Sequence, residues 1–176
     1  MDKKPPKKIS RTYLENAALY YLQRYATSAE NLKRVMMRKV KKSCAFHQLP
    51  VEDFAPLVDE LVTRYISSGL IDDTVFARAR VTSLRRQGLS KQAIMARLQA
   101  KGLSKSQIEA ALRLVDEDQE DPEMTAARAC ARRKKLGPWR KTPLTDPKSR
   151  QKELATMGRA GFSYEIARRA LEAGED

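Results

Sequence analysis

The side chains that could take part in catalysis or metal binding are few, and they do not form a complete site. Cys44 and His47 have the C-x-x-H spacing of metal ligands, but no second pair of Cys or His exists to complete the four ligands that zinc prefers. No serine or cysteine motif surrounds His47, which is expected in a loop. Asp72 and Asp73 are better explained as a helix N-cap pair than as catalytic carboxylates. With no phosphate-binding glycine-rich loop either, we expect a protein that is not an enzyme and needs no cofactor and no metal.

Basic side chains are the abundant chemical groups, and they suit phosphate oxygens. Arg78 and Arg85 lie seven residues apart, which places them on one face of a helix. The predicted strip continues on the next helix and contains Arg78, Arg80, Arg85, Arg86, Lys91, Arg97 and Lys101. Such a strip should bind nucleic acid with a steep salt dependence, because neutralised phosphates release counterions. The alternative is a set of solvated helix faces balanced by acidic segments.

Two further basic runs are candidate contacts to nucleic acid or to an acidic partner. Cations at the C-terminal end of a helix also complement its dipole without any ligand. Each run is therefore equally explained by contact with a polyanion or an acidic partner and by a purely structural role. The first run contains Lys33, Arg34, Arg38, Lys39, Lys41 and Lys42, and the second contains Arg132, Arg133, Lys134 and Lys135.

The aromatic residues allow a second kind of nucleic-acid contact. Tyr20, Tyr21, Tyr25 and Tyr65 could stack on bases, as aromatic side chains do in proteins that bind single strands. Aromatic residues at helical spacing are more often part of a core, and we predict that role for all four. Trp139, between Pro138 and Arg140, is expected to pack its loop down rather than to anchor a partner.

The charge is unevenly distributed along the chain. The total is 35 Lys and Arg against 22 Asp and Glu, a formal net charge of +13. Residues 1–50 carry a net +9 and residues 71–115 a net +6, whereas residues 116–123 carry a net −6. A basic protein of this kind suits nucleic acid, an anionic membrane surface or an acidic protein. Charge alone does not choose among these partners.

The cysteine content and the N terminus indicate the cytoplasm. Two cysteines do not make a disulfide framework and fit a reducing compartment. Residues 1–11 are basic and are not followed by an apolar stretch, so they do not resemble a secretory signal. No run approaches the ~18 apolar residues of a spanning helix. We expect a cytoplasmic monomer without membrane contact.

Helical periodicity and helix start signals predict an all-α fold. The segments 27–30 and 104–107 read as capping boxes, and Asp121-Pro122 and Asp146-Pro147 place an N-cap before a proline in the first turn. Three apolar stripes are expected to be buried: Phe76, Ala79 and Ser83; Ile94 and Leu98; Ile108, Ala111 and Leu112. The predicted helices are 12–25, 28–42, 51–68, 73–86, 91–101, 105–115, 122–135, 147–159 and 164–173.

The helices fall into triplets with internal similarity. With an offset of 59, Gly102 matches Gly161 and Ser104 matches Ser163, so each glycine should end one helix and each serine cap the next. The first triplet matches only over its second helix. We predict a basic flexible tail at 1–11 and three tandem three-helix repeats at 12–70, 71–117 and 118–176, which form an elongated, curved row.

Two stretches resemble the RecX family of regulatory proteins. The first is the run Gly69-Leu70-Ile71-Asp72-Asp73, followed by Phe76-Ala77 and by the arginine-rich helix end at 83–88. The second is the stretch at 92–112, and residues 127–135 and 161–166 are similar to the family's third repeat. The resemblance covers roughly residues 14–171. It implies three tandem three-helix units that lie in the groove of a RecA nucleoprotein filament.

This resemblance implies a regulator that binds the RecA filament with single-stranded and also double-stranded DNA, and that restrains RecA ATP hydrolysis and strand exchange. Two hypotheses of other classes compete with it. A general nucleic-acid-binding protein without a dedicated partner should bind bare DNA as tightly as the filament. A structural adaptor of acidic proteins should not bind DNA even at low salt.

Overall fold

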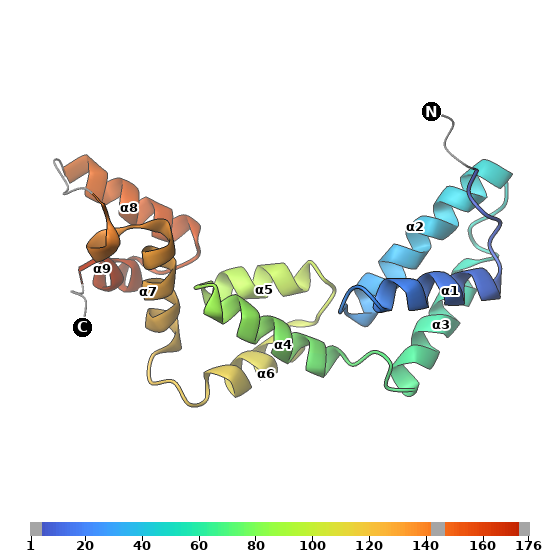
Figure 1. Cartoon of the computed structure of the whole chain (residues 1–176), viewed down its shortest axis with the longest axis horizontal. Helices are drawn as coiled ribbons and strands as arrows, with labels where there is room; N and C mark the ends of the chain where they lie inside the picture. Colours follow the sequence, from blue (N-terminus) through green and yellow to red (C-terminus); the bar gives the residue numbers. More distant parts are fainter. Residues whose placement is uncertain (1–4, 142–146, 173–176) are drawn as a thin grey trace. The chain divides into compact units, whose positions relative to one another are not determined.

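Nine α-helices and one short 3₁₀ helix, η1, make up the described part of the chain, and no strand occurs there. The computed structural model describes residues 5–141 and 147–172. The all-α prediction is thereby confirmed. The elements are α1 (Arg11–Leu22), α2 (Ala29–His47), α3 (Ala55–Ser67), α4 (Asp73–Arg86), α5 (Lys91–Gln99), α6 (Lys105–Asp116), α7 (Pro122–Lys134), η1 (Gly137–Trp139), α8 (Pro147–Arg159) and α9 (Tyr164–Glu172) (Figure 1).

The helix starts follow the predicted capping signals with one shift. Ser104 and Gln107 form a capping box, and Asp121 caps α7 ahead of Pro122. The capping box predicted at 27–30 is wrong. Ser28 is the N-cap, and its side chain accepts a hydrogen bond from the backbone N–H of Asn31. Glu30 instead pairs with Arg34. Asp146 lies outside the described residues.

The chain divides into two compact units. The first comprises residues up to Phe76 together with Lys101–Leu103, and the second comprises Ala77–Ala100 and the residues from Ser104 on. We describe each by itself. The tandem row of repeats, its curvature and the predicted domain limits stay predictions.

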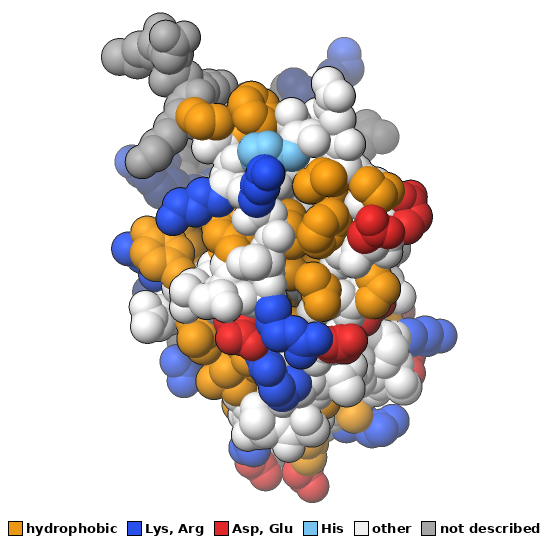
Figure 2. Space-filling model, turned by 90° about the vertical axis from the view of Figure 1, so that its right-hand side faces the viewer, with side chains coloured by type: hydrophobic (Ala, Val, Ile, Leu, Met, Phe, Trp, Pro, Cys, Tyr) orange, Lys and Arg blue, Asp and Glu red, His pale blue; other side chains and the backbone are white. Residues whose placement is uncertain are grey.

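The first unit buries one core between α1, α2 and α3. Leu14, Leu32, Met36 and Val58 are at most 1 % exposed. Within a helix the buried residues recur at helical spacing, as Leu32 and Met36 do on α2, which is how an amphipathic helix buries one stripe. Apolar side chains also reach the surface of this unit, where Figure 2 shows them interspersed with basic and acidic ones.

The segment before α1 is held against α2. Ile9 is buried in the core of the first unit. The Ser43 hydroxyl donates to the backbone carbonyl of Lys7 at 2.8 Å, and His47 Nε2 lies 2.9 Å from the carbonyl oxygen of Pro6. Figure 1 shows this segment passing the C-terminal end of α2 before α1 begins. From residue 5 onward, the segment predicted as a flexible tail therefore makes defined contacts with α2 and with the core.

The second unit contains a core formed by α7, α8, α9 and η1. Cys130, Met157 and Ala170 are fully buried there, and Trp139 packs against them as predicted.

Along α4 the predicted stripe of Phe76, Ala79 and Ser83 is wrong beyond Phe76. Ala79 is exposed and Ser83 is half-buried, whereas the buried residues are Ala77, Val81 and Leu84. The two other predicted stripes, on α5 and α6, are buried.

The glycine corners predicted from the internal similarity are confirmed. Gly102 and Gly161 have φ of 85° and 88°, and Ser104 and Ser163 accept backbone N–H groups of the next helix. Each corner also receives a second serine: Ser28 Oγ donates to the Lys101 carbonyl, and Ser90 Oγ donates to the Ala160 carbonyl at 2.8 Å. The two bonds are equivalent because Ser28 and Ser90 are the N-caps of α2 and α5.

Replacing Ser90 with alanine should therefore lower the free energy of unfolding of the second unit by about 2 kcal/mol, since it removes both a helix cap and a partner of a carbonyl group. Ser90 is fully buried. The matched control is Ser104→Ala, which removes an exposed cap and should cost about 1 kcal/mol. Urea unfolding followed by circular dichroism measures both. Equal losses for the two variants would show that the bond to Ala160 contributes nothing.

Candidate nucleic-acid interface

The basic run on α2 forms an exposed surface on the first unit. Arg34, Arg38, Lys41 and Lys42 are exposed, and their spacing of three to four residues places them on one side of the helix. Lys39 is half-buried. Arg34 donates to Glu30 at 2.9 Å. Across residues 5–141 and 147–172, Arg38, Lys41 and Lys42 have no carboxylate partner.

Lys33, the first residue of this run, is used within the unit. Its ammonium group lies 2.5 Å from Asp59 on α3. The hydrogen bond that Lys33 donates to Asp59 raises the pKa of Lys33 above its ordinary value. This pair joins α2 to α3 at the surface, where an ion pair contributes at most about 1 kcal/mol.

The arginines of α4 divide into exposed and buried groups. Arg78, Arg80 and Arg86 are exposed. The side chain of Arg85 is only 8 % exposed. Arg85 lies in the last turn of α4, which the end of α6 and the start of α7 cover, whereas Arg78 lies beyond their reach. Seven-residue spacing therefore places two arginines on one face without giving them the same surroundings.

Arg85 is held by two carboxylates and a carbonyl. Its Nε and Nη2 donate to Asp116 at 3.1 and 2.7 Å, and its Nη1 donates to Glu123 at 2.8 Å and to the Leu89 carbonyl at 3.2 Å. Burial disfavours the charged form, but the hydrogen bonds to Asp116 and Glu123 outweigh it, so the pKa of Arg85 lies above its ordinary value. The guanidinium group is thus committed to structural bonds, and we leave Arg85 out of the proposed interface.

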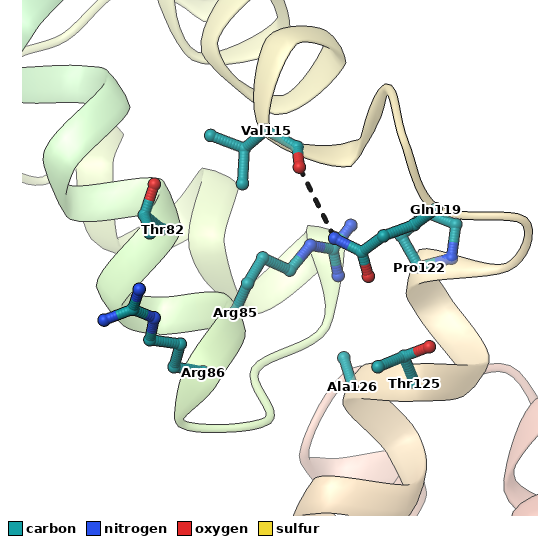
Figure 3. A pocket seen from close by; sticks show the side chains of 8 residues that line it. All are labelled: Thr82, Arg85, Arg86, Val115, Gln119, Pro122, Thr125 and Ala126. Atoms are coloured by element: carbon teal, nitrogen blue, oxygen red, sulfur yellow. Dashed lines mark hydrogen bonds between the residues drawn. The ribbon is translucent and has the colours of Figure 1, made fainter.

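A cavity of about 250 Å³ lies beside this ion-pair group, between α4 and the α6–α7 connection (Figure 3). Arg85 points toward Gln119 across this space, whereas Arg86 points away from it. Gln119 itself donates to the Val115 carbonyl at 3.4 Å. Two adjacent arginines therefore face different environments, and only Arg86 presents its charge to solvent.

The structure brings the end of α4 and the end of α7 together. Arg133 Nη1 donates to the backbone carbonyl of Gln87 at 2.5 Å, directly after Arg86. We name the resulting exposed group the α4–α7 cluster. Within the described ranges no carboxylate pairs with any member of it. The cluster contains Arg86, Arg132, Arg133, Lys134 and Lys135.

The remaining predicted contacts lie on or after α5. Lys91 and Arg97 are exposed at the start and the last turn of this helix. Lys101 is exposed too, but α5 ends at Gln99, and Lys101 belongs to the first unit. The structure thus leaves untested whether these cations form one strip with Arg78. The backbone N–H of Lys91 is used within the unit and donates to Glu123 at 3.1 Å.

The tyrosines do not all belong to the core. Tyr65 is 6 % exposed and confirms the prediction, and Tyr21 is half-buried. Tyr20 and Tyr25 are 59 % and 56 % exposed, so the core prediction is wrong for both. Tyr20 lies on a face of α1 that is turned away from the core, next to Tyr21, which packs against the core, and Tyr25 lies three residues beyond the end of the helix. Tyr20 and Tyr21 are adjacent in the sequence, so they point to different sides of the helix.

The two candidate metal ligands have other contacts. His47 lies in the last turn of α2, not in a loop, and its ring contacts the Pro6 carbonyl. Cys44 is buried. In the part of the chain that the structure describes, no three His, Cys, Asp or Glu residues are grouped as metal ligands would be. No helix there is long and apolar enough to span a bilayer.

The two aspartates at the start of α4 act at helix N termini. Asp72 accepts the backbone N–H groups of Thr74 and Val75 at 2.8 and 3.0 Å, which confirms its predicted capping role. Asp73 instead accepts the N–H of Ala29, the first residue of α2, at 2.8 Å. In the same way, Glu123 on α7 accepts the backbone N–H of Lys91, the first residue of α5. These acids stabilise helix N termini by charge and by hydrogen bonding.

Sequence comparisons give the family context of this arrangement. The second three-helix domain of RecX matches residues 72–112. The chain is 40 % identical over 169 residues to the regulatory protein RecX of Myxococcus xanthus, covering 96 % of this chain and 89 % of that protein. It is 31 % identical to the RecX protein of Agrobacterium fabrum, covering 91 % of this chain and 82 % of that protein. No solved structure shows a significant match.

Proposed function

Because the chain belongs to the RecX family of regulatory proteins, we propose that it binds the RecA nucleoprotein filament and its DNA and restrains ATP hydrolysis and strand exchange. In this proposal the protein acts by binding and catalyses no reaction of its own. It would work in the cytoplasm, in DNA repair, recombination and the SOS response.

The observation that carries the proposal is the set of exposed cations without carboxylate partners. Arginine and lysine side chains without a carboxylate partner keep an uncompensated charge and remain available for phosphate contacts. The α4–α7 cluster concentrates five such residues from two segments that lie far apart in the sequence. Arg38, Lys41 and Lys42 provide a similar surface on α2.

The remaining predicted residues support the same mechanism. Arg78, Arg80, Lys91, Arg97 and Lys101 are exposed and complete the proposed interface. Contacts of these side chains to phosphate would position the protein on the filament without reading base sequence. Contacts to acidic recombinase surface would add partner specificity. Restraint of ATP turnover then follows from occupying the filament and opposing its conformational cycle.

The test measures ATP turnover by RecA on single-stranded DNA as this protein is added. We expect turnover to fall, and we expect the double variant Arg86→Gln/Arg132→Gln to need several-fold more protein for the same effect, because each lost phosphate contact weakens binding. The matched control is Arg113→Gln/Arg169→Gln, which removes two exposed cations outside the proposed interface.

Two outcomes would contradict the proposal. Unchanged turnover at saturating, filament-bound protein would exclude the restraint of RecA. Affinity for bare DNA equal to that for the filament would favour a general nucleic-acid-binding protein. Equal effects of the two double variants would remove the α4–α7 cluster from the interface while leaving the regulatory activity in place.

A further inference from the structure

A groove on the first unit combines free lysines with an exposed aromatic ring. Its volume is about 510 Å³. One wall is a face of α1 that includes Thr12, Asn16 and Tyr20. Lys7, Lys8 and Lys39 also line the groove. We name it the α1 groove. Its α1 residues recur every four positions, so they span about 12 Å along the helix axis.

The α1 groove is positively charged without compensation. No Asp or Glu lines it, and none of its three lysines has a carboxylate partner among the described residues. The first turn of α1 contains no acidic residue. Glu15 on the same helix is paired with Arg64 of α3 at 2.5 Å. An anionic ligand is therefore the complementary occupant.

Tyr20 adds a feature that a simple anion site does not need. Its side chain is 59 % exposed, and the Arg24 guanidinium lies 3.7 Å from its ring centroid. This cation–π contact orients the ring while leaving most of it open to solvent. Exposed aromatic rings next to a basic groove are the arrangement by which proteins bind unstacked bases of single strands.

We propose that the α1 groove binds a short stretch of single-stranded nucleic acid, with Lys7, Lys8 and Lys39 on the phosphates and Tyr20 stacked on a base. This inference deepens the proposed function, on which it rests for its biological setting. In a duplex the base faces are already stacked, so Tyr20 has no base to stack on. The groove therefore confers a preference for single strands, which the basic surfaces on α2, α4 and α7 do not confer.

The position of the N-terminal segment makes this site possible. Lys7 and Lys8 reach the groove because Ile9 is buried and the Lys7 carbonyl accepts from Ser43. Lys39 comes from the neighbouring helix α2. Three separate segments thus line one groove, and its lysines come from the two segments that do not carry Tyr20.

The experiment measures binding of a labelled oligothymidylate to the full chain by fluorescence anisotropy, without recombinase. Tyr20→Leu should weaken binding about tenfold, whereas Tyr20→Phe, which keeps the ring, should bind like the unaltered protein. Duplex binding should change little. The matched control is Tyr25→Leu, because Tyr25 is equally exposed but does not line the groove.

The lysines are tested by the salt dependence of the same binding. Lys39→Gln should reduce the slope of log K against log salt by about 0.7, the value for one phosphate contact on a single strand. If Lys39→Gln weakens binding but Tyr20→Leu does not, the groove is an anion site suited to an acidic protein segment, and the proposal is overturned. Equal losses for Tyr20→Leu and Tyr25→Leu would overturn it too.

Failure of this inference is separable from failure of the proposed function. The oligonucleotide assay contains no recombinase, and the turnover assay uses the unaltered chain. A Tyr20-dependent preference for single strands with no effect on ATP turnover would support the groove alone. Restraint of turnover with Tyr20-independent binding would support the regulator alone.

Discussion

Replacing Arg85 with methionine is expected to lower the free energy of unfolding of the second unit by about 3 kcal/mol, because two carboxylates would lose the charge that holds them. Arg85 bonds both oxygens of Asp116 and one oxygen of Glu123. Side-chain exposure is only 8 % for Arg85 and 15 % for Asp116. Water therefore screens the remaining carboxylates poorly, and the loss exceeds that of a surface ion pair.

The control for this prediction is the adjacent residue. Arg86→Met removes the same charge from an exposed position without a carboxylate partner, so it should change the free energy of unfolding by less than about 0.5 kcal/mol. Arg85→Lys should recover only part of the loss, because one ammonium group cannot reproduce the planar fork of a guanidinium. Chemical denaturation followed by circular dichroism measures all three variants. A loss for Arg85→Met as small as that for Arg86→Met would contradict the assigned structural role.

The difference between Arg85 and Arg86 determines how variants in the arginine-rich end of α4 should be interpreted. A variant of Arg85 should impair regulation by unfolding the second unit, whereas a variant of Arg86 should impair it through the surface alone. Stability therefore has to be measured before any effect of Arg85 on recombinase activity is assigned to the interface. Variants of these two adjacent residues therefore distinguish an effect on folding stability from an effect on binding.

The features that could be predicted from the sequence are the local ones. A cap involves a residue and the backbone three positions on, so Ser104, Asp121 and Ser163 were identifiable without knowledge of the fold. The glycine corners at Gly102 and Gly161 are local in the same sense. Helical periodicity is also a local signal, which is why the all-α fold could be predicted from the sequence.

The features that could not be predicted depend on residues far away in the sequence. The partners of Arg85 are 31 and 38 positions away, and nothing near Arg85 in the sequence signals them. Tyr20 is exposed because the face of α1 that packs against the core of the unit is the one with Leu14 and Ala18, and Tyr20 lies outside that face. On α4, Val81 and Leu84 were a signal that the buried stripe runs through them, since both are larger and more apolar than the predicted Ala79 and Ser83.

The α1 groove also could not be located from the sequence, because it depends on contacts between distant residues. Residues 5–10 contain two lysines and two prolines, a composition typical of a tail, and only the burial of Ile9 and the bonds from Ser43 and His47 fix them. Basic composition predicts only that the ligand is anionic. Its location depends on which cations remain unpaired, which is a property of the folded chain.

Replacing Gly88 with alanine is the second change with a large expected effect, a loss of about 2 to 4 kcal/mol from overpacking together with a left-handed backbone. Gly88 has φ of 70°, and an added Cβ would lie 2.5 Å from the backbone nitrogen of Cys130 and 2.9 Å from the Ala126 carbonyl oxygen. These are backbone atoms of α7, so relief of the contact requires α7 to move away from the end of α4.

Gly69→Ala separates the two contributions, because Gly69 has a nearly identical φ of 72° but no atom within 4 Å of the added carbon. It should cost only about 1 kcal/mol. The buried cysteines report where each change acts: Cys130 lies in the second unit and Cys44 in the first. In Gly88→Ala, reaction with a thiol reagent should accelerate at Cys130 and stay slow at Cys44. Because α7 also carries most of the α4–α7 cluster, the same variant should bind DNA more weakly without losing a single charge. Unchanged reactivity of Cys130 would contradict the prediction, because it would mean that α7 accommodates the methyl group in place.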